Sequence, residues 1–492
     1  MKKIILFTIL LTTSLINAQN TLLQAEFWKN NPTVSSVQAE IKKGNSASEA
    51  NTNNFDPTTL AINNNAPLET ILYLIKQEGN SVHKLTHDGR IYLHWAAYRG
   101  NVELVKYLIN NGADINLTDD KGAIPLVFAA SSGQADPALY EVFFKAGNNP
   151  KQKYKNGATV LLLAIANDKD LKLVDFLKTK GLSIKDTDDL GNTAFNYAAR
   201  NGDIKLLKDI LKRGVKFDGR ALVIASQGSR SHSNTLETYK YLVEDLKINP
   251  NSLGDDGENV LHNLVKKPKQ EENIAYFLAK GTDVNQQDKE LNTVLMNAMR
   301  GSIDVVNTFF SKVKDINTTN SKGMSALSFA VENGSAEMVQ FLLAKGAKTD
   351  LVDKKGNNLA YYWVQSYKPA TAKKEQNDDF QTKYDLLEKA GVNFSNSQKD
   401  GSSLYHLSTA KNDLALMMKL EKIGIDLNAK NEEGMTVLQK AALTATDDSI
   451  LKYLVSKGAK TDIKTEFDET AYDLASENEL LIKNKVSLDF LK

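Results

Sequence analysis

The chain has 492 residues, of which 41% are hydrophobic and 25% are charged, a composition typical of a folded globular protein. Its 61 basic and 60 acidic residues nearly cancel, so charge provides no argument for binding nucleic acid or an anionic membrane surface. The sequence contains no cysteine, which excludes disulfides, cysteine-ligated metal sites and thiol catalysis.

Residues 1–18 have the pattern of a secretory signal peptide. Lys2 and Lys3 precede a mostly apolar stretch over 4–16, and Ala18 is a small residue at the expected cleavage point. The stretch is short for the ~30 Å apolar core of a bilayer, so an uncleaved membrane anchor is the weaker alternative. Loops rich in Asn and Lys favour a bacterial protein. We therefore expect export to the periplasm, with the extracellular medium as the alternative, and no membrane insertion after cleavage.

Residues 19–54 are expected to form a helical cap at the start of the folded chain. The segments TLLQAEFWKNN and SVQAEIKK within 21–43 fit a pair of helices. A cap of this kind is expected where a repeat array begins, because terminal repeats are atypical.

From residue 55 onward, two markers recur in phase. The first is Gly-x-x-x-Leu followed three positions later by a small residue, with clear neighbouring copies 33 to 35 residues apart. Its clear copies begin at Gly89, Gly122, Gly157, Gly191, Gly257, Gly323 and Gly434. The second is a later glycine in each unit, at Gly112, Gly147, Gly181, Gly214, Gly281, Gly346, Gly391, Gly424 and Gly458. Two markers in register predict a repeat array.

The copy LHWAAYRGNVELVKYLINNGADIN, residues 93–116, indicates how one unit folds. Ala96 and its neighbour give a short first helix a small-residue face that allows close packing. Apolar residues at helical spacing over 102–109 predict a second, amphipathic helix. Gly112 suits the left-handed end of that helix, and the polar residues up to Gly122 suit a hairpin tip. Neither helix can bury its apolar face alone, so the units must stack.

This pattern resembles the ankyrin repeat. The family's Thr-Pro-Leu-His-x-Ala motif corresponds to Ile91–Ala96, and its Gly-Ala-Asp-x-Asn motif is intact at Gly112–Asn116. A second close match runs from Met324 to Ala347. The resemblance covers roughly residues 55–474. It implies an all-α repeat solenoid of stacked helix-turn-helix units with β-hairpin or turn connections, about 12–14 units including the caps.

Two insertions interrupt the spacing, at 227–235 and at 366–382. Surface loops tolerate added length, so decoration is favoured over a contact role for both. Leu264 and Trp363 replace the small alanine, and these two units are expected to pack differently. The predicted organisation is a first sub-array over 55–365, an inserted loop over 366–382, a second sub-array over 383–464 and a C-terminal cap over 465–492.

His83, His87 and His94 form the one suggestive histidine cluster. A helix would place all three imidazoles on one face, where they could hold zinc. Asp88 and Gly89 instead place His83 and His87 in a connecting hairpin. The resemblance makes His94 the motif histidine, which orders its turn by local hydrogen bonds, as it does for the equivalent His262 and His406. We predict a structural role for these residues and no metal or other cofactor.

Paired acidic residues recur at the expected hairpin tips, as in Asp119-Asp120 and Asp188-Asp189. A solvated turn explains them better than a calcium site, because the alternating acidic spacing of a calcium loop is absent. The sequence contains no GxxxxGK phosphate loop, no GxSxG elbow and no HExxH pair. Catalysis is therefore not expected.

The resemblance implies that a protein partner docks on the concave side, formed by hairpin tips and the exposed edge of each first helix. The corresponding positions in the copy with the clearest motif are His87, Asp88, Arg90, Tyr98 and Arg99. Tyrosine and arginine are enriched at interface hot spots. A solvated edge without a partner is an equally strong interpretation of these residues from composition alone.

The leading hypothesis is a monomeric, non-catalytic periplasmic scaffold that binds a protein partner. Since some exported bacterial ankyrin proteins are associated with oxidative-stress defence, the resemblance suggests support of a stress-defence enzyme. The alternative is a secreted effector that engages a host or competitor protein. A metal-dependent enzyme or metal-binding protein using His83, His87 and His94 is the third hypothesis.

Overall fold

The computed structural model describes residues 20–229, 233–369 and 379–492. The predicted signal peptide over 1–18 lies outside these residues. Contacts divide the chain into two compact units, one ending at Ala221 and the other beginning at Leu222, within one helix. Each unit is described by itself.

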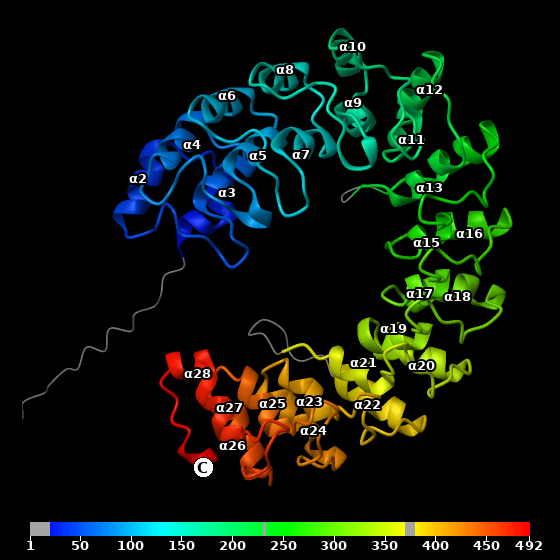
Figure 1. Cartoon of the computed structure of the whole chain (residues 1–492). Coiled ribbons are helices and arrows are strands. Elements are labelled where there is room, and N and C mark those ends of the chain that lie inside the picture. The colour runs from blue at the N-terminus through cyan, green and yellow to red at the C-terminus, as the bar shows by residue number, and fades with distance from the viewer. Residues whose placement is uncertain (1–19, 230–232, 370–378) are drawn as a thin grey trace, which may run out of the picture. The chain divides into compact units, whose positions relative to one another are not determined.

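In the first unit, short helices alternate with turns and pair in chain order (Figure 1). Their bounds are α1 (Ala25–Lys29), α2 (Val34–Lys42), α3 (Pro57–Asn63), α4 (Leu68–Ile75), α5 (Tyr92–Tyr98), α6 (Val102–Asn110), α7 (Pro125–Ser131), α8 (Pro137–Lys145), α9 (Val160–Ala164), α10 (Lys172–Thr179), α11 (Ala194–Ala199) and α12 (Ile204–Lys212). Helix α13 (Arg220–Gln227) crosses the division between the units.

The second unit continues the same alternation. Its helices are α14 (Leu236–Lys240), α15 (Val260–Leu264), α16 (Glu271–Ala279), α17 (Val294–Ala298), α18 (Ile303–Phe309), α19 (Ala326–Asn333), α20 (Ala336–Ala344), α21 (Leu359–Gln365), α22 (Asp379–Lys389), α23 (Leu404–Thr409), α24 (Leu414–Leu420), α25 (Val437–Thr444), α26 (Ser449–Ser456), α27 (Ala471–Glu477) and α28 (Glu479–Lys483). A π-helical turn over Tyr241–Asp245 extends α14.

The 28 helices of the described residues form fourteen pairs, in agreement with the predicted unit number. Odd-numbered helices pack on one another in a row, as α5 does on α3 and α7, and even-numbered helices form a second row, as α6 does on α8. The described residues contain no β-strand, only isolated bridges such as Gln287–Thr293. The predicted all-α repeat solenoid is confirmed, with turns as the connections.

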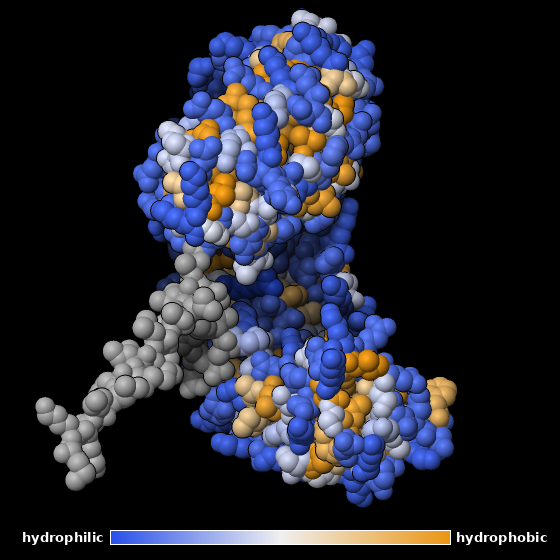
Figure 2. Space-filling view, turned by 90° about the vertical axis from the view of Figure 1, so that its left-hand side faces the viewer, coloured by the Kyte–Doolittle hydropathy of each residue, from blue (hydrophilic) through white to orange (hydrophobic). Residues whose placement is uncertain are grey.

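The core lies between the two helix rows of each unit. In the representative pair α5 and α6, Leu93, Ala96, Leu104 and Leu108 are fully buried. On the face drawn in Figure 2, hydrophobic residues form separate patches in a mostly hydrophilic surface. Within the described part of the chain, no helix has the length and apolar character to cross a membrane.

Hairpin tips of neighbouring repeats are joined by backbone hydrogen bonds. The amide of Asp120 donates to the carbonyl of Asp88 at 2.9 Å, and the amide of Lys354 donates to the carbonyl of Lys322 at 2.8 Å. The close approach requires glycine beside the contact: Gly323 has φ of +82°, and an added Cβ would lie 2.8 Å from the Lys354 amide nitrogen. Tip-to-tip bonding therefore fixes the stacking of adjacent repeats.

The predicted break between two sub-arrays at 366–382 stays a prediction. Helix α21 packs on α19 before the insertion and on α23 after it, and the compact units divide at Ala221. Helix α22 also begins at Asp379, inside the predicted loop. Residues 370–378 and 230–232 of the two insertions lie outside the described part of the chain.

An aromatic cluster joins the two sides of this insertion. The Trp363 ring stacks on Phe380 with centroids 4.2 Å apart, and its Nε1 donates to the Phe380 carbonyl at 2.8 Å. Tyr384 and Phe394 contact the same indole. The tryptophan that replaces the small alanine therefore links the residues on the two sides of the insertion.

Candidate functional site

In α5, α15 and α23, the third residue of the helix is a histidine that connects its own repeat to the next. His94 Nδ1 accepts a hydrogen bond from the Ile91 amide at 3.3 Å, and its Nε2 lies 3.1 Å from the Ala123 carbonyl. His262 and His406 make equivalent pairs of bonds. Burial lowers the pKa of all three imidazoles, which favours the neutral form that these bonds require. The predicted structural role of the motif histidines is confirmed.

The three histidines considered for zinc do not converge. His94 is fully buried, with both ring nitrogens in the bonds just described. His87 lies in the turn His87–Gly89, where its Nδ1 is 2.8 Å from the Asn53 carbonyl oxygen, and His83 is exposed. Within the described residues, no group of three or more His, Asp or Glu could hold a metal ion. The structure therefore does not bring these three histidines together.

The acidic residues at the tips stabilise their own turns. One oxygen of Asp119 accepts hydrogen bonds from the Lys121 and Ala123 amides, both at 2.9 Å. Asp188 accepts from the Leu190 and Asn192 amides in the same way. Asp119 and Asp188 are buried, whereas Asp120 and Asp189 beside them are exposed, so the predicted solvated turn holds for the second residue of each pair.

Arg90, a predicted partner-binding residue, is buried at 5% exposure. Its Nε and Nη2 bind Asp119 of the next repeat at 2.9 and 2.8 Å, and its Nη1 lies 3.1 Å from Asp88. The guanidinium carbon is also 4.2 Å from the Phe128 ring centroid and 5.1 Å from that of Trp95. Arg90 is therefore part of the packing between two repeats, and its guanidinium is not exposed to a partner.

Asp88 is also bound within the array. It adopts a left-handed conformation with φ of 57°, and its Oδ2 is 2.7 Å from the Lys121 Nζ. The hydrogen bond from Lys121 is the largest effect on this carboxyl and lowers its pKa. A salt bridge between neighbouring tips is the main role that the structure gives Asp88.

His87 and Tyr98 are brought together on one half-buried surface. The His87 ring stacks on Phe55 with centroids 4.5 Å apart, and the Tyr98 ring stacks on Phe128 at 5.4 Å. Trp95 lies between the two pairs, 5.6 Å from Phe55 and 5.8 Å from Phe128. We call these five residues, from three consecutive repeats, the aromatic surface.

Arg99 lies at the edge of the aromatic surface. Its Nε donates to the Asn65 side-chain oxygen at 2.9 Å, and its guanidinium carbon is 5.8 Å from the Tyr98 ring centroid. Both contacts are at exposed or half-exposed positions. Of the five predicted residues, His87, Tyr98 and Arg99 are therefore accessible, whereas Arg90 is not and Asp88 is held by ion pairs.

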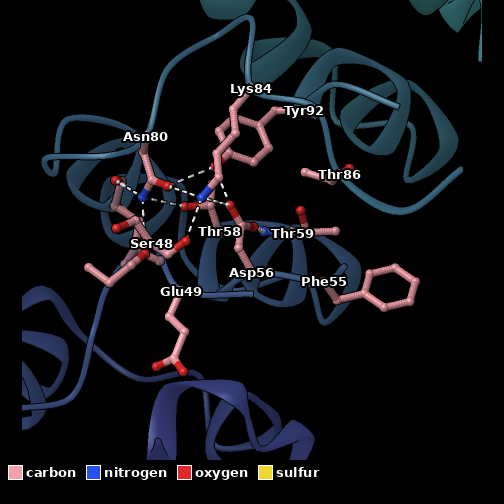
Figure 3. Close-up of polar contacts among 12 residues, drawn as sticks. Ser48, Glu49, Phe55, Asp56, Thr58, Thr59, Asn80, Lys84, Thr86 and Tyr92 are labelled. Atoms are coloured by element: carbon pink, nitrogen blue, oxygen red, sulfur yellow. Dashed lines mark hydrogen bonds and ion pairs between the residues drawn. The ribbon is translucent and has the colours of Figure 1, made fainter. Parts of the chain in front are cut away.

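A buried polar network holds the loop that carries His87 (Figure 3). Asp56 is fully buried; its Oδ2 accepts from the Tyr92 hydroxyl at 2.5 Å and pairs with Lys84 Nζ at 2.7 Å, and its Oδ1 caps α3 through the Thr59 amide. Burial raises the pKa of the Tyr92 hydroxyl. Every one of these groups is engaged, so the network is a structural support.

The adjacent Phe55 points away from this network (Figure 3) and toward the stack with His87. Sequence reasoning did not identify Phe55 or Phe128 as surface residues. A usable signal existed for Phe128: it occupies the fourth position of its first helix, as Trp95 does. Alignment at that position would have placed both rings on one side of the array.

The sequence matches the family model described as "Ankyrin repeats (3 copies)" over residues 58–221 and 261–374. It is 26% identical to the ankyrin repeat and KH domain-containing protein mask-1 of Caenorhabditis elegans, over 51% of this chain and 10% of that protein. It is 25% identical to the human transient receptor potential cation channel subfamily A member 1, over 75% of this chain and 39% of the channel. For the palmitoyltransferase AKR1 of Lachancea kluyveri, the identity is 30% over 32% of this chain and 21% of that enzyme. The chain thus spans less than half the length of each of these relatives.

Proposed function

Since the chain belongs to the ankyrin-repeat family, whose repeats imply a protein-interaction scaffold, we propose that it binds a protein partner through the aromatic surface without catalysing a reaction. The observation that carries this proposal is the contiguous set of rings across three repeats, in which four half-buried rings surround the buried Trp95. Aromatic side chains supply large contact area at low entropic cost and are enriched at hot spots.

The buried contacts of Trp95 and Arg90 hold these rings in fixed positions, which favours a role in recognising a partner. Trp95 is 6% exposed and donates from Nε1 to the Thr86 hydroxyl at 2.8 Å, which fixes its ring plane. Arg90 packs against the rings of Trp95 and Phe128 while bound to two carboxylates. A partner would meet a preorganised surface, so little ordering entropy would be lost on binding.

We further propose that the chain acts after export to the periplasm, where a stress-defence enzyme is the partner class suggested by the family resemblance. The support is the signal-peptide pattern over residues 1–18. Cell fractionation with N-terminal sequencing tests it. A mature N-terminus at Gln19 in the periplasmic fraction is expected, whereas recovery mainly from the medium would favour the secreted-effector alternative.

Cross-linked capture from the periplasm tests the partner surface. We expect the wild-type chain to recover a protein that the double variant Tyr98→Ala/Phe128→Ala recovers at least about tenfold less well, since hot-spot truncations cost about 2 kcal/mol or more. Tyr107→Ala, on the second helix α6, is the matched control and should behave as wild type. Equal recovery by the double variant and the control would refute the proposed surface.

A further inference from the structure

A pocket of about 320 Å³ lies on the first-helix side of the second unit, where α15, α17 and α19 pack in a row. Its apolar lining comes from Met296, Met299 and Phe329. The two methionines are 4% and 1% exposed, so their side chains form a floor, and the half-buried Phe329 forms a wall. We call this feature the methionine pocket. It is separate from the aromatic surface, which lies in the first unit.

One polar group within the pocket has no partner. The side-chain nitrogen of Asn297 is buried and donates no hydrogen bond to any described residue. Asn297 occupies the fourth position of α17, the position that Trp95 occupies in α5. A buried donor left unpaired costs about 1–3 kcal/mol, so this amide is suited to a ligand that supplies an acceptor oxygen.

Two positively charged side chains lie at the rim of the pocket. Lys266 and Arg300 are both exposed, and neither forms an ion pair with another described residue. Arg300 Nη2 donates to the Asn333 side-chain oxygen at 2.6 Å, and Asn333 in turn donates to Glu332 at 2.9 Å. Lys266 and Arg300 outnumber Glu332, the one carboxylate in this chain of contacts, so these residues have a net positive charge.

We propose that the methionine pocket binds a peptide segment in which an aspartate or glutamate side chain lies next to an apolar side chain. The carboxylate accepts from Asn297 and pairs with Lys266 and Arg300, and the apolar side chain packs on Met296, Met299 and Phe329. Charge complementarity selects the acidic residue, and the flexible thioethers adapt to the apolar one. The volume lies within the range of small-ligand pockets and fits a pair of side chains.

The apolar floor favours a peptide over a simple anion. A site for phosphate or nucleic acid would need more cations than these two, and it would not place two buried methionines and a phenylalanine beneath them. The pocket therefore requires a ligand with both an anionic and an apolar group. This inference concerns a second site and does not depend on the aromatic surface.

Methionine methyl resonances test the proposal directly. Full-length protein labelled with ¹³C-methyl methionine is titrated with the blocked peptide Ac-Gly-Ser-Glu-Leu-Ser-Gly-NH₂, and Met296→Leu and Met299→Leu assign the two signals. We expect these two signals to shift with saturation, and much less with matched peptides in which Gln replaces Glu or Ser replaces Leu. Lys266→Gln/Arg300→Gln should raise the Kd at least about tenfold. Lys389→Gln, exposed on α22, is the control variant and should leave it unchanged.

Several outcomes would overturn the proposal. They are equal shifts with the Glu and Gln peptides, no shift at millimolar peptide, shifts with inorganic phosphate alone, or binding only of a Gly-Ser-Leu peptide with a free C-terminal carboxylate. The Lys266→Gln/Arg300→Gln variant retains its fold if its urea midpoint matches that of Lys389→Gln. The Tyr98→Ala/Phe128→Ala variant should bind the peptide normally, so failure of one site is distinguishable from failure of the other.

Discussion

The guanidinium group of Arg90 binds the carboxylate of Asp119 in the following repeat, with both residues buried. The other oxygen of Asp119 organises its own hairpin tip through two backbone amides. A single ion pair therefore connects the order of one turn to the position of the next repeat. It also holds Arg90 against the rings of Trp95 and Phe128.

Replacing Arg90 with alanine should destabilise the first unit by about 3 kcal/mol, because the buried Asp119 would lose its counter-charge. Urea unfolding followed by circular dichroism measures the effect. Arg99→Ala is the matched control and should cost less than about 1 kcal/mol, since Arg99 makes one hydrogen bond at an exposed position. Similar losses for the two variants would contradict a supporting role for Arg90.

Gly323→Ala and Gly346→Ala should differ although both positions have nearly the same positive φ, +82° and +86°. Each alanine costs about 1–2 kcal/mol in the left-handed region. At Gly323 the added Cβ would also lie 2.8 Å from the Lys354 backbone, adding about 1–3 kcal/mol, whereas nothing lies within 4 Å at Gly346. Urea unfolding midpoints of the two variants measure the difference. Equal midpoints would mean that the hairpin tips of neighbouring repeats can move apart at Gly323 without loss of stability.

Protein stability should fall as pH drops below about 6.5, the pKa of histidine in an unfolded chain. Burial lowers the pKa of His94, His262 and His406 in the folded state, so the unfolded chain binds more protons below pH 6.5. Their contribution is complete above pH 6.5 and is lost as pH falls toward the lowered pKa values. Urea midpoints measured between pH 7.5 and 5 check this dependence.

Glutamine at the three histidine positions provides the control for that experiment. Gln439 occupies the equivalent position of α25, where its oxygen accepts from the Thr436 amide and its nitrogen donates to the Glu469 carbonyl. The triple variant His94→Gln/His262→Gln/His406→Gln should therefore fold at neutral pH and show a flatter dependence between pH 6.5 and 5. An unchanged slope would assign the effect to other groups.

Trp363→Ala should destabilise the second unit by about 3–5 kcal/mol, because it empties a buried site lined by Phe380, Tyr384 and Phe394. Trp363→Phe keeps most of the packing and loses the hydrogen bond to the Phe380 carbonyl, so it should destabilise the unit by only about 1 kcal/mol. Thermal unfolding followed by calorimetry compares the two variants with the wild type. A small loss for alanine would mean that the repeats on the two sides of the insertion are stable without this cluster.

The local structure of each repeat was predictable because it depends on residues close in sequence. Helix pairing and the left-handed glycines follow from periodicity, capping and backbone preferences within one unit, and the role of His94 was implied by the family resemblance. The same reasoning did not find the contact between Arg90 and Asp119, because Asp119 lies 29 residues away in the next repeat. Nor does the sequence reveal that Trp363 and Phe380 stack across the insertion at 366–382.

The sequence alone determined a repeat array of paired helices, because every unit carries the same short-range signals in register. Only the tertiary structure decided which side chains from different repeats meet. The stacking of successive units brings Phe55, Tyr98 and Phe128 onto one surface. It also brings Lys266 and Arg300 to the rim of one pocket. Stacking geometry arises from contacts about one repeat apart, and residue patterns within a single repeat contain no record of those contacts.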